Sequence, residues 1–352
     1  MGNISVSSNI QFVGSPKDRL RINKPDGFKI DLNIVISLPI NMHRDPVNPE
    51  ESNIIIEQKY PGFLQLRAGT QYQKILVRDG QECLINRTAN EWLDNRNYIL
   101  RSKFSDWFKS VGNRGLNQFQ KMNGQPSCIV DGMKYTIRTS SGGPAWTIII
   151  EAGLFRLDVD LVPALKFPES RWLEGRNYRK IPQECRRGYW MVVPEPHMAG
   201  QMDQDAQRSW HICLQSQEDQ LFNNTYLLRK TFQLLEKLRD AQGMDKLAPY
   251  YIKTLFFWEI DDKKNTDPTF WQRKNIATLF EYMLNKLYEA LDNGSIQYFW
   301  NKKNNLIGHL NTCTRNEYKG KFMYLLENIR DYKLVAKYLL TSVEYKEYQQ
   351  FL

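Results

Sequence analysis

The first half of the chain alternates stretches that have the apolar pattern of strands with stretches that have the pattern of helices. Residues 29–38 are rich in Ile, Val and Leu with polar interruptions, and Pro39 ends the run, so a β-strand is predicted there. Residues 89–108 distribute large apolar side chains among charged ones, which is typical of a helix. Three further stretches have the composition of strands: 127–138, 146–151 and 158–165.

The second half is predominantly helical. Residues 168–207 are rich in Pro, Arg, Glu and Gln, and we expect an irregular crossing segment there. From Glu218 onward, apolar residues recur at three- and four-residue steps. Helices are predicted at 221–240, 250–258, 276–291 and 318–339, with Gly243 and Gly294 closing the first and the third. The pattern predicts an α+β fold with a mixed α/β lobe at 1–207 and a helical lobe at 208–352.

The composition is that of a globular protein. Its positive charge is compatible with an anionic partner or with a well-solvated surface. It has 352 residues, of which 41% are hydrophobic and 25% are charged, so disorder is not favoured. The formal net charge of +9 is compatible with binding to a nucleic acid or a nucleotide, and equally with simple solubility.

Cysteine usage points to a reducing compartment. The five cysteines are scattered, their number is odd, and they form no CxxC pair or His/Cys cluster, which argues against disulfides and against zinc. The N-terminal residues are polar and lack the apolar core of a signal peptide. No run reaches the roughly 18 apolar residues that a membrane span needs. We therefore expect a cytoplasmic protein without a membrane anchor.

The candidate chemistry lies in a Gly-Ser turn and in the strand that follows it. Gly14 permits close approach of a phosphate to the backbone, and the Ser15 hydroxyl can donate to it. In a nucleotidyltransferase site, the next strand presents acids at positions i and i+2, which share one face and grip a divalent ion. Here Gly27 and Lys29 hold these two positions, so two carboxylates are absent.

Several segments together resemble the cyclic GMP-AMP synthase-like receptors and the wider Mab-21 family. They are residues 14–39, 141–146, 157–165, 210, 234–240 and 250–258. The resemblance implies a bilobed nucleotidyltransferase fold with a nucleotide cleft between the lobes. It also implies antiviral innate immune sensing of double-stranded nucleic acid, often RNA. Such receptors join ATP and GTP into a cyclic dinucleotide that activates STING. Relatives begin with a long helix that braces both lobes, and we expect most of that helix to be lacking here.

The resemblance also assigns roles to individual residues. Asp160 matches the third catalytic carboxylate, which binds Mg²⁺ or Mn²⁺ in the family. The phosphate turn corresponds to Gly14 and Ser15. The residues matching other nucleotide contacts are Lys237 for the triphosphate, Tyr250 for stacking on a base, and His211 where relatives have a base-contacting Arg. The zinc thumb of the vertebrate synthase, built from one His and three Cys, has no counterpart between Trp210 and Lys237.

Four departures from the family pattern predict weakened catalysis. They are Gly27, Lys29, Pro249 and His211. Three interpretations of Lys29 are open: its ammonium neutralises a phosphate directly, it is a polar residue on the strand surface, or it forms a salt bridge with Asp160, and we favour the last two over the first. Asp31 shares a face with Lys29 but lies about 6–7 Å further along the strand. It is either a polar residue at the strand end, which we favour, or an unusual metal ligand acting with Asp160.

Five basic residues lie between positions 96 and 114, near the helix that binds nucleic acid in sensing relatives. Lysines and arginines spaced along one face suffice for phosphate contacts, and the aromatic residues Trp107 and Phe108 interleave with them. A solvated helix face is the alternative interpretation. The five candidate residues are Arg96, Arg101, Lys103, Lys109 and Arg114.

Three functions remain open at this point. We favour a receptor homologue that binds double-stranded RNA or DNA and whose cyclic dinucleotide synthesis is weak or lost, because Asp160 alone does not hold two ions. The second is an active nucleotidyltransferase that uses Asp31 with Asp160. The third is a Mab-21-type scaffold without nucleic-acid or nucleotide ligands.

Overall fold

A computed structural model describes residues 8–13, 28–38, 42, 52–70, 72, 84–175, 177–196, 204–222 and 226–350. Within these ranges, residues 8–13, 28 and 84–87 are described by their backbone alone. The chain divides into two compact units. The first contains residues 1–18, 23–172 and 186–216, and the second contains 19–22, 173–185 and 217–352.

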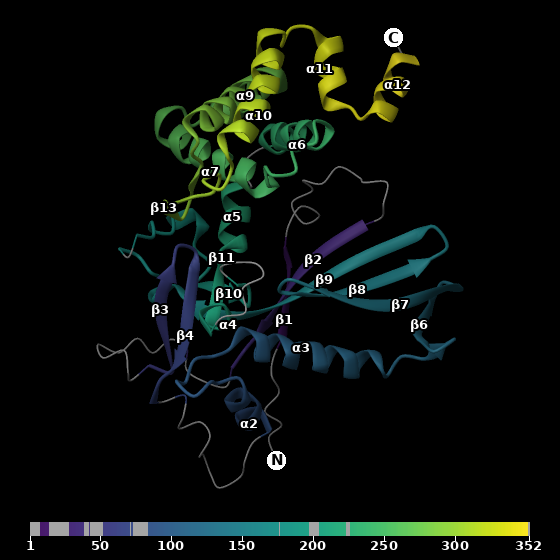
Figure 1. The fold of residues 1–352 in the computed structure, drawn as a ribbon, viewed down its shortest axis with the longest axis vertical. Helices are drawn as coiled ribbons and strands as arrows, with labels where there is room; N and C mark the ends of the chain where they lie inside the picture. Colours follow the sequence, from purple (N-terminus) through teal and green to yellow (C-terminus); the bar gives the residue numbers. More distant parts are fainter. Residues whose placement is uncertain are drawn as a thin grey trace. The chain divides into compact units, whose positions relative to one another are not determined.

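The first unit is built on one mixed sheet, in which the described residues form eleven strands (Figure 1). The strand order is β3–β4–β11–β10–β9–β8–β7–β6–β5, and β2 joins it through β9 with β1 beside β2. The long strand β9 (Phe155–Pro168) pairs antiparallel with β8 (Ala145–Ala152) and with β10 (Tyr189–Val193). It pairs in parallel with β2 (Phe28–Ile36). The remaining strands are β1 (Ser8–Val13), β3 (Ile54–Tyr60), β4 (Phe63–Ala68), β5 (Lys121–Met122), β6 (Gln125–Val130), β7 (Met133–Gly142) and β11 (Ser209–Cys213).

The two faces of this sheet differ in chemistry because side chains alternate along each strand. The pairing of β8 with β9 places Trp146 opposite Leu161 on one face and Thr147 opposite Asp160 on the other. Helix α3 (Arg101–Leu116) contacts the apolar face, where the Phe108 and Trp146 rings meet edge to face at 6.4 Å. The polar face is therefore the one that carries the candidate carboxylate.

Several predicted elements are confirmed, and three predictions are wrong in part. Strands β2, β8 and β9 lie where the apolar pattern indicates them, whereas residues 127–138 form two strands joined by a turn. The predicted single helix over 89–108 is two helices, α2 (Leu84–Glu91) and α3, because the bridge between Leu93 and Ile99 closes a turn between them. The segment 168–207 is not wholly irregular, since β10 and the short helix α4 (Gln204–Arg208) lie within it.

The second unit is helical, apart from the hairpin of β12 (Gln297–Tyr298) and β13 (Asn301–Asn305). Helix α9 (Ile276–Asn293) begins at Asn275, whose side chain accepts a hydrogen bond from the Thr278 amide. It ends at Gly294, which has a φ of +67° that glycine adopts readily. Helix α5 (Gln215–Leu221) contains the boundary between the two units. The other helices of the second unit are α6 (Tyr226–Ala241), α7 (Pro249–Thr266), α8 (Phe270–Arg273), α10 (Thr312–Glu327), α11 (Tyr332–Leu339) and α12 (Ser342–Gln350).

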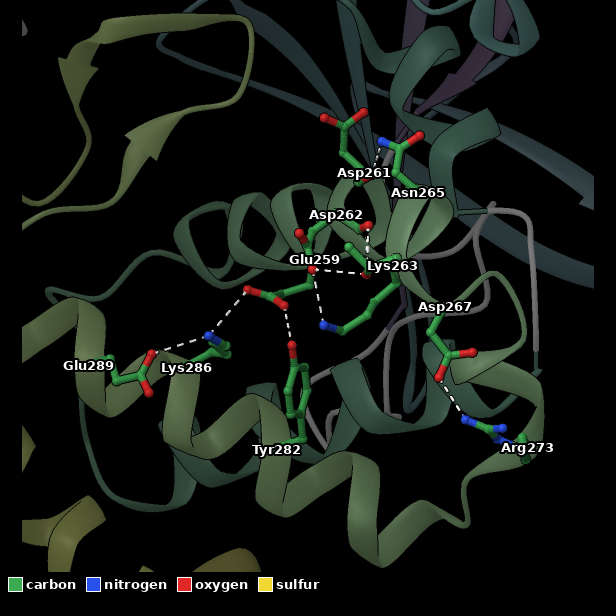
Figure 2. Close-up of polar contacts among 11 residues, drawn as sticks. Glu259, Asp261, Asp262, Lys263, Asn265, Asp267, Arg273, Tyr282, Lys286 and Glu289 are labelled. Carbon is green, nitrogen blue, oxygen red and sulfur yellow. Dashed lines mark hydrogen bonds and ion pairs between the residues drawn. The ribbon is translucent and has the colours of Figure 1, made fainter.

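Polar contacts join α7 to α9 in this unit (Figure 2). Glu259 of α7 accepts a hydrogen bond from the Tyr282 hydroxyl of α9 and lies 3.8 Å from the Lys286 ammonium. The Lys263 ammonium lies 5.4 Å from the centre of the Tyr282 ring. Burial, together with the hydrogen bond to Glu259, raises the pKa of Tyr282 to about 12, so its hydroxyl remains a donor at neutral pH. These contacts fix α7, whose first turn carries Tyr250.

Candidate functional site

The Asp160 carboxylate is held from two sides on the polar face of the sheet. The Lys29 ammonium of β2 lies 2.6 Å from Asp160 Oδ2. The Thr147 hydroxyl of β8 donates to Asp160 Oδ1 at 2.5 Å, from the position directly opposite in the strand pair. The predicted salt bridge between Lys29 and Asp160 is therefore confirmed. Asp160 is mostly buried, with 16% of its side chain exposed, so this pairing is less screened than a surface ion pair.

Asp31 lies beside Asp160 rather than apart from it. The parallel register pairs Asp31 with Asp160 and Lys29 with Asp158, so the two acids occupy neighbouring positions on adjacent strands. The Lys29 ammonium is 3.7 Å from Asp31 Oδ1 and thus contacts both acids. The interpretation of Asp31 as a residue at the strand end is wrong, because β2 continues to Ile36. The register brings together the two carboxylates named in the alternative catalytic hypothesis.

The neighbouring acid Asp158 has a partner of its own. Arg156 donates to it through Nε and Nη2, at 2.9 and 3.1 Å, in a bidentate pair. Arg156 also lies 3.7 Å from Glu151, which forms a bidentate pair with Arg138 across the β7–β8 ladder. The acids on this face are thus paired with basic side chains, and the face contains a continuous row of alternating charges.

His211 lies on β11, directly after the buried Trp210. Its Nδ1 is 3.4 Å from Glu195 Oε2, and its ring centre is 4.9 Å from that of Phe63. Removal from water lowers the pKa of His211 and outweighs the opposing attraction of Glu195. The imidazole is therefore neutral at pH 7, so it does not replace the positive charge of an arginine at this position.

Lys237 of α6 forms an ion pair within the second unit. Its ammonium contacts the carboxylate of Glu344, which lies in the C-terminal helix α12. The hydrogen bond from Lys237 is the largest cause of the lowered pKa of Glu344, so this carboxylate is ionised at neutral pH. The other Glu344 oxygen caps the start of α12 by accepting from the Thr341 amide at 2.8 Å. The candidate triphosphate contact thus already has an anionic partner from the same chain.

Tyr250 is fixed by a buried carboxylate. Its hydroxyl donates to Glu218 Oε1 at 2.5 Å, and the Trp300 indole donates to the same oxygen at 3.0 Å. Burial raises the pKa of Glu218, and the nearby Lys253 opposes this effect. The Tyr250 ring itself is half-buried. The hydroxyl is thus committed to the protein, and the ring is the part of Tyr250 suited to stacking.

The basic residues of α3 do not form one continuous face. At roughly 100° per residue, Lys103 and Arg114 lie on the same side of the helix, whereas Lys109 lies about 120° away from Lys103. The Arg101 side chain turns inward, where its Nε donates to the Ala206 carbonyl at 2.7 Å. Arg96 lies in the preceding turn and is exposed. Lys103 and Arg114 are thus the pair best placed for a shared phosphate contact.

The aromatic residues that interleave with these charges are half-buried and make ring contacts within the first unit. Trp107 contacts Trp92 and Phe104, with ring centres 5.1 and 5.9 Å apart, and Phe108 contacts Trp146. These contacts join α3 to its neighbours and leave the rings of Trp107 and Phe108 only partly exposed. The remaining candidates, Gly14, Ser15 and the vacant position at Gly27, lie outside the described residues.

Known family domains match most of the chain. The Mab-21 protein nucleotidyltransferase domain matches residues 16–224, and the Mab-21 protein HhH/H2TH-like domain matches residues 227–324. The chain is 30% identical over 342 residues to a cyclic GMP-AMP synthase-like receptor of Tribolium castaneum, which covers 96% of this chain and 80% of the relative. The chain belongs to the Mab-21 family, among its cyclic GMP-AMP synthase-like receptors. The expected family and α+β fold are confirmed.

Two further relatives carry the same name. The receptor of Ctenocephalides felis is 28% identical over 352 residues, covering 97% of this chain and 78% of the relative. That of Aethina tumida is 28% identical over 342 residues, covering 96% of this chain and 80% of the relative. The likeness thus extends across both units of this Mab-21 family member.

The residues of this family member do not fit the divalent ions that nucleotidyltransferase domains typically use. Mg²⁺ takes six oxygen ligands at about 2.0–2.1 Å, and a two-ion site needs several carboxylates directed at the ions. Here the two adjacent acids share the ammonium of Lys29. Among the residues that the structure describes, no group of three or more His, Cys, Asp or Glu side chains lies close enough to share a metal ion.

Sequence reasoning missed several residues that shape these sites. Thr147 could have been found, since it follows the recognised Trp146 on a strand and so faces the side of Asp160 if the two strands pair. Glu218 and Glu344 had no such signal, because their contacts to Tyr250 and Lys237 span 32 and 107 residues of sequence. In the described parts of the chain, no helix is both long enough and apolar enough to cross a bilayer.

Proposed function

We propose that this chain is a cytoplasmic sensor of double-stranded nucleic acid, RNA favoured, that acts in antiviral innate immunity with weak or lost cyclic dinucleotide synthesis. The observation that supports reduced catalysis is the ion pair between Lys29 and Asp160, 2.6 Å long. An ammonium at this place repels a divalent ion and occupies the oxygen that such an ion would bind. The free state of Cys128, Cys185, Cys213 and Cys313 supports the reducing compartment.

Changes around the proposed ATP and GTP contacts support the same interpretation. His211 is neutral where relatives have an arginine, and Glu344 competes with any polyphosphate for the ammonium of Lys237. Pro249 at the first turn of α7 lacks the backbone N–H that would otherwise point toward an anion. Each change reduces positive potential or donors for a triphosphate. Signalling through STING would then require a residual activity or a partner enzyme.

The test is a synthesis assay in which the missing acids are restored. Purified protein is incubated with labelled ATP and GTP, Mg²⁺ or Mn²⁺, and long double-stranded RNA. We expect no product or a trace from the wild type, and more from the Gly27→Glu/Lys29→Asp variant. Adding Asp160→Ala to that variant should abolish the gain. A cyclic dinucleotide from the wild type that is lost in Asp160→Ala would instead favour the alternative of a live enzyme using Asp31 with Asp160, which lie side by side.

Charge reversal on α3 should weaken RNA binding. Lys103 and Arg114 share one side of α3, and both side chains are exposed, so together they can contact one phosphate backbone. For Lys103→Glu/Arg114→Glu we expect weaker binding to a duplex of any sequence. We also expect a salt slope of log K that is shallower by roughly 1 for each phosphate that the variant no longer neutralises. Fluorescence anisotropy at several salt concentrations measures both quantities.

The control for this experiment carries the same change in net charge elsewhere. Lys333→Glu/Lys346→Glu alters two exposed lysines on α11 and α12 of the second unit. Equal losses in the two variants would mean that overall charge, rather than α3, governs binding. A wild type that does not bind RNA or DNA with a salt-dependent affinity would favour the third function, a scaffold without nucleic-acid ligands.

A further inference from the structure

The parallel pairing of β2 with β9 creates a cluster that requires a cation. Asp31 and Asp160 are register partners, and neighbouring strands lie about 4.8 Å apart. Two carboxylates at this spacing repel each other unless a positive charge lies between them. Only 16% of the Asp160 side chain is exposed, so water screens the repulsion incompletely. A positive charge at this point of the sheet therefore lowers the repulsion between the two acids.

Lys29 supplies that cation from within the chain. It precedes Asp31 by two positions and so projects from the same face of β2. Its ammonium reaches 2.6 Å from Asp160 Oδ2 and 3.7 Å from Asp31 Oδ1. The Thr147 hydroxyl donates to the other oxygen of Asp160 and completes the arrangement. The Lys29 ammonium thus contacts both acids and offsets part of their combined negative charge.

The same position cannot hold a divalent ion while the ammonium is present. An ion bound to Asp160 Oδ2 and Asp31 Oδ1 would lie within a few ångströms of Nζ, where two positive charges repel strongly. The next acid, Asp158, is held bidentately by Arg156 and does not replace the lost ligands. We propose that Lys29 is a tethered substitute for a divalent cation, and that removing its charge converts Asp31 and Asp160 into a divalent-cation site.

This inference does not depend on the proposed sensing function, because it concerns ion binding by the chain alone. The test compares wild type with Lys29→Met by titration with Mn²⁺, with free Mn²⁺ followed by electron paramagnetic resonance. We expect the variant to bind one Mn²⁺ at least about tenfold more tightly than wild type, since a unit charge beside the ion is removed. In EDTA the variant should unfold at a lower temperature than wild type, and Mn²⁺ should restore its midpoint.

Three further variants make the result specific. Lys29→Arg keeps the charge and should bind Mn²⁺ no better than wild type. Lys29→Met/Asp160→Asn should lose the gained site. Lys59→Met, which removes the lysine of the ion pair with Asp205 elsewhere in the sheet, should gain no site. Lys29→Gln replaces Lys29→Met if the latter does not fold. Equal Mn²⁺ affinity in wild type and Lys29→Met, or a midpoint for Lys29→Met that does not respond to Mn²⁺, would overturn the proposal.

Discussion

Replacing Arg208 with methionine should lower the free energy of unfolding by about 3–5 kcal/mol, because it leaves a buried carboxylate without its partner. The guanidinium donates to Asp94 Oδ2 through Nε at 2.7 Å and Nη2 at 2.5 Å, and it lies 4.3 Å from the centre of the Tyr98 ring. The two side chains are only 5% and 10% exposed, so water does not compensate Asp94 when Arg208 is removed. Urea unfolding followed by tryptophan fluorescence measures the loss.

The matched control is Arg138→Met in the same sheet unit. Arg138 also makes a bidentate pair, with Glu151, but 48% of its side chain is exposed. Exposed pairs contribute about 0–1 kcal/mol, so this variant should remain close to wild type. A loss for Arg208→Met no larger than that for Arg138→Met would contradict the claim that burial makes the first pair important.

The ion pair between Arg208 and Asp94 should also make the stability of the first unit depend on pH in the acid range. Burial alone raises the pKa of Asp94, but hydrogen bonds from the Tyr98 amide, Arg208 and the Arg96 amide outweigh it and leave the pKa below the usual 3.8. A lowered folded-state pKa means that the stabilisation is present above pH 3.8 and is lost as the pH falls through the lowered value. The stability difference between wild type and Asp94→Asn should therefore shrink in acid.

Elements whose apolar pattern is local can be predicted from the sequence, and elements defined by distant partners cannot. Helix α9 is predicted to end near Gly294, because a periodic run followed by glycine has a local cause. Strand β10 escapes prediction, although Trp190 and Met191 are fully buried, because a continuous apolar run of five residues has no period. Its identity as a strand comes from its pairing with β9 and β11.

The residues of the candidate site also fall into those that the local sequence predicts and those that depend on distant partners. The ion pair between Lys29 and Asp160 could be predicted because strand alternation fixes the face of each residue, and both positions were known from the resemblance. The position of Asp31 beside Asp160 could not be predicted, since only the parallel register places it there rather than beside Asp158. The inward turn of Arg101 depends on α4, an element without a signal in the sequence, because its acceptor is the Ala206 carbonyl.

The residues of the candidate nucleotide site have partners within the chain, both where they depart from the family pattern, as Lys29 does, and where they match it, as Lys237 and Tyr250 do. Lys29 binds Asp160 and Asp31, Lys237 binds Glu344, and Tyr250 binds the buried Glu218. A site that lost acids without compensation would leave charges unpaired in a partly buried place, at a cost in stability. Here the ammonium groups of Lys29 and Lys237 each have a carboxylate partner, so this cost is reduced.

Substituting Gly112 with alanine should destabilise the first unit by about 1–3 kcal/mol, although alanine is ordinarily the better helix former. A Cβ added at Gly112 would overlap the indole of Trp146, with Cε3 only 2.8 Å away and Cζ3 and Cη2 closer still. Trp146 is itself buried, and its ring also meets Phe108 edge to face, so it has little freedom to retreat. The absence of a side chain at Gly112 is thus what lets α3 approach β8 closely.

Gly115→Ala on the same helix is the matched control. In the part of the chain that the structure describes, no atom beyond the helix's own backbone and the adjacent residues lies within 4 Å of a Cβ at this position. Helix propensity therefore decides, and stability should rise by up to about 1 kcal/mol. Opposite signs for two identical substitutions three residues apart separate packing from propensity. If both variants were stabilised, the close approach to Trp146 would be refuted. Because α3 also carries Lys103 and Arg114, a displaced α3 in Gly112→Ala should weaken RNA binding as well, whereas Gly115→Ala should leave it unchanged.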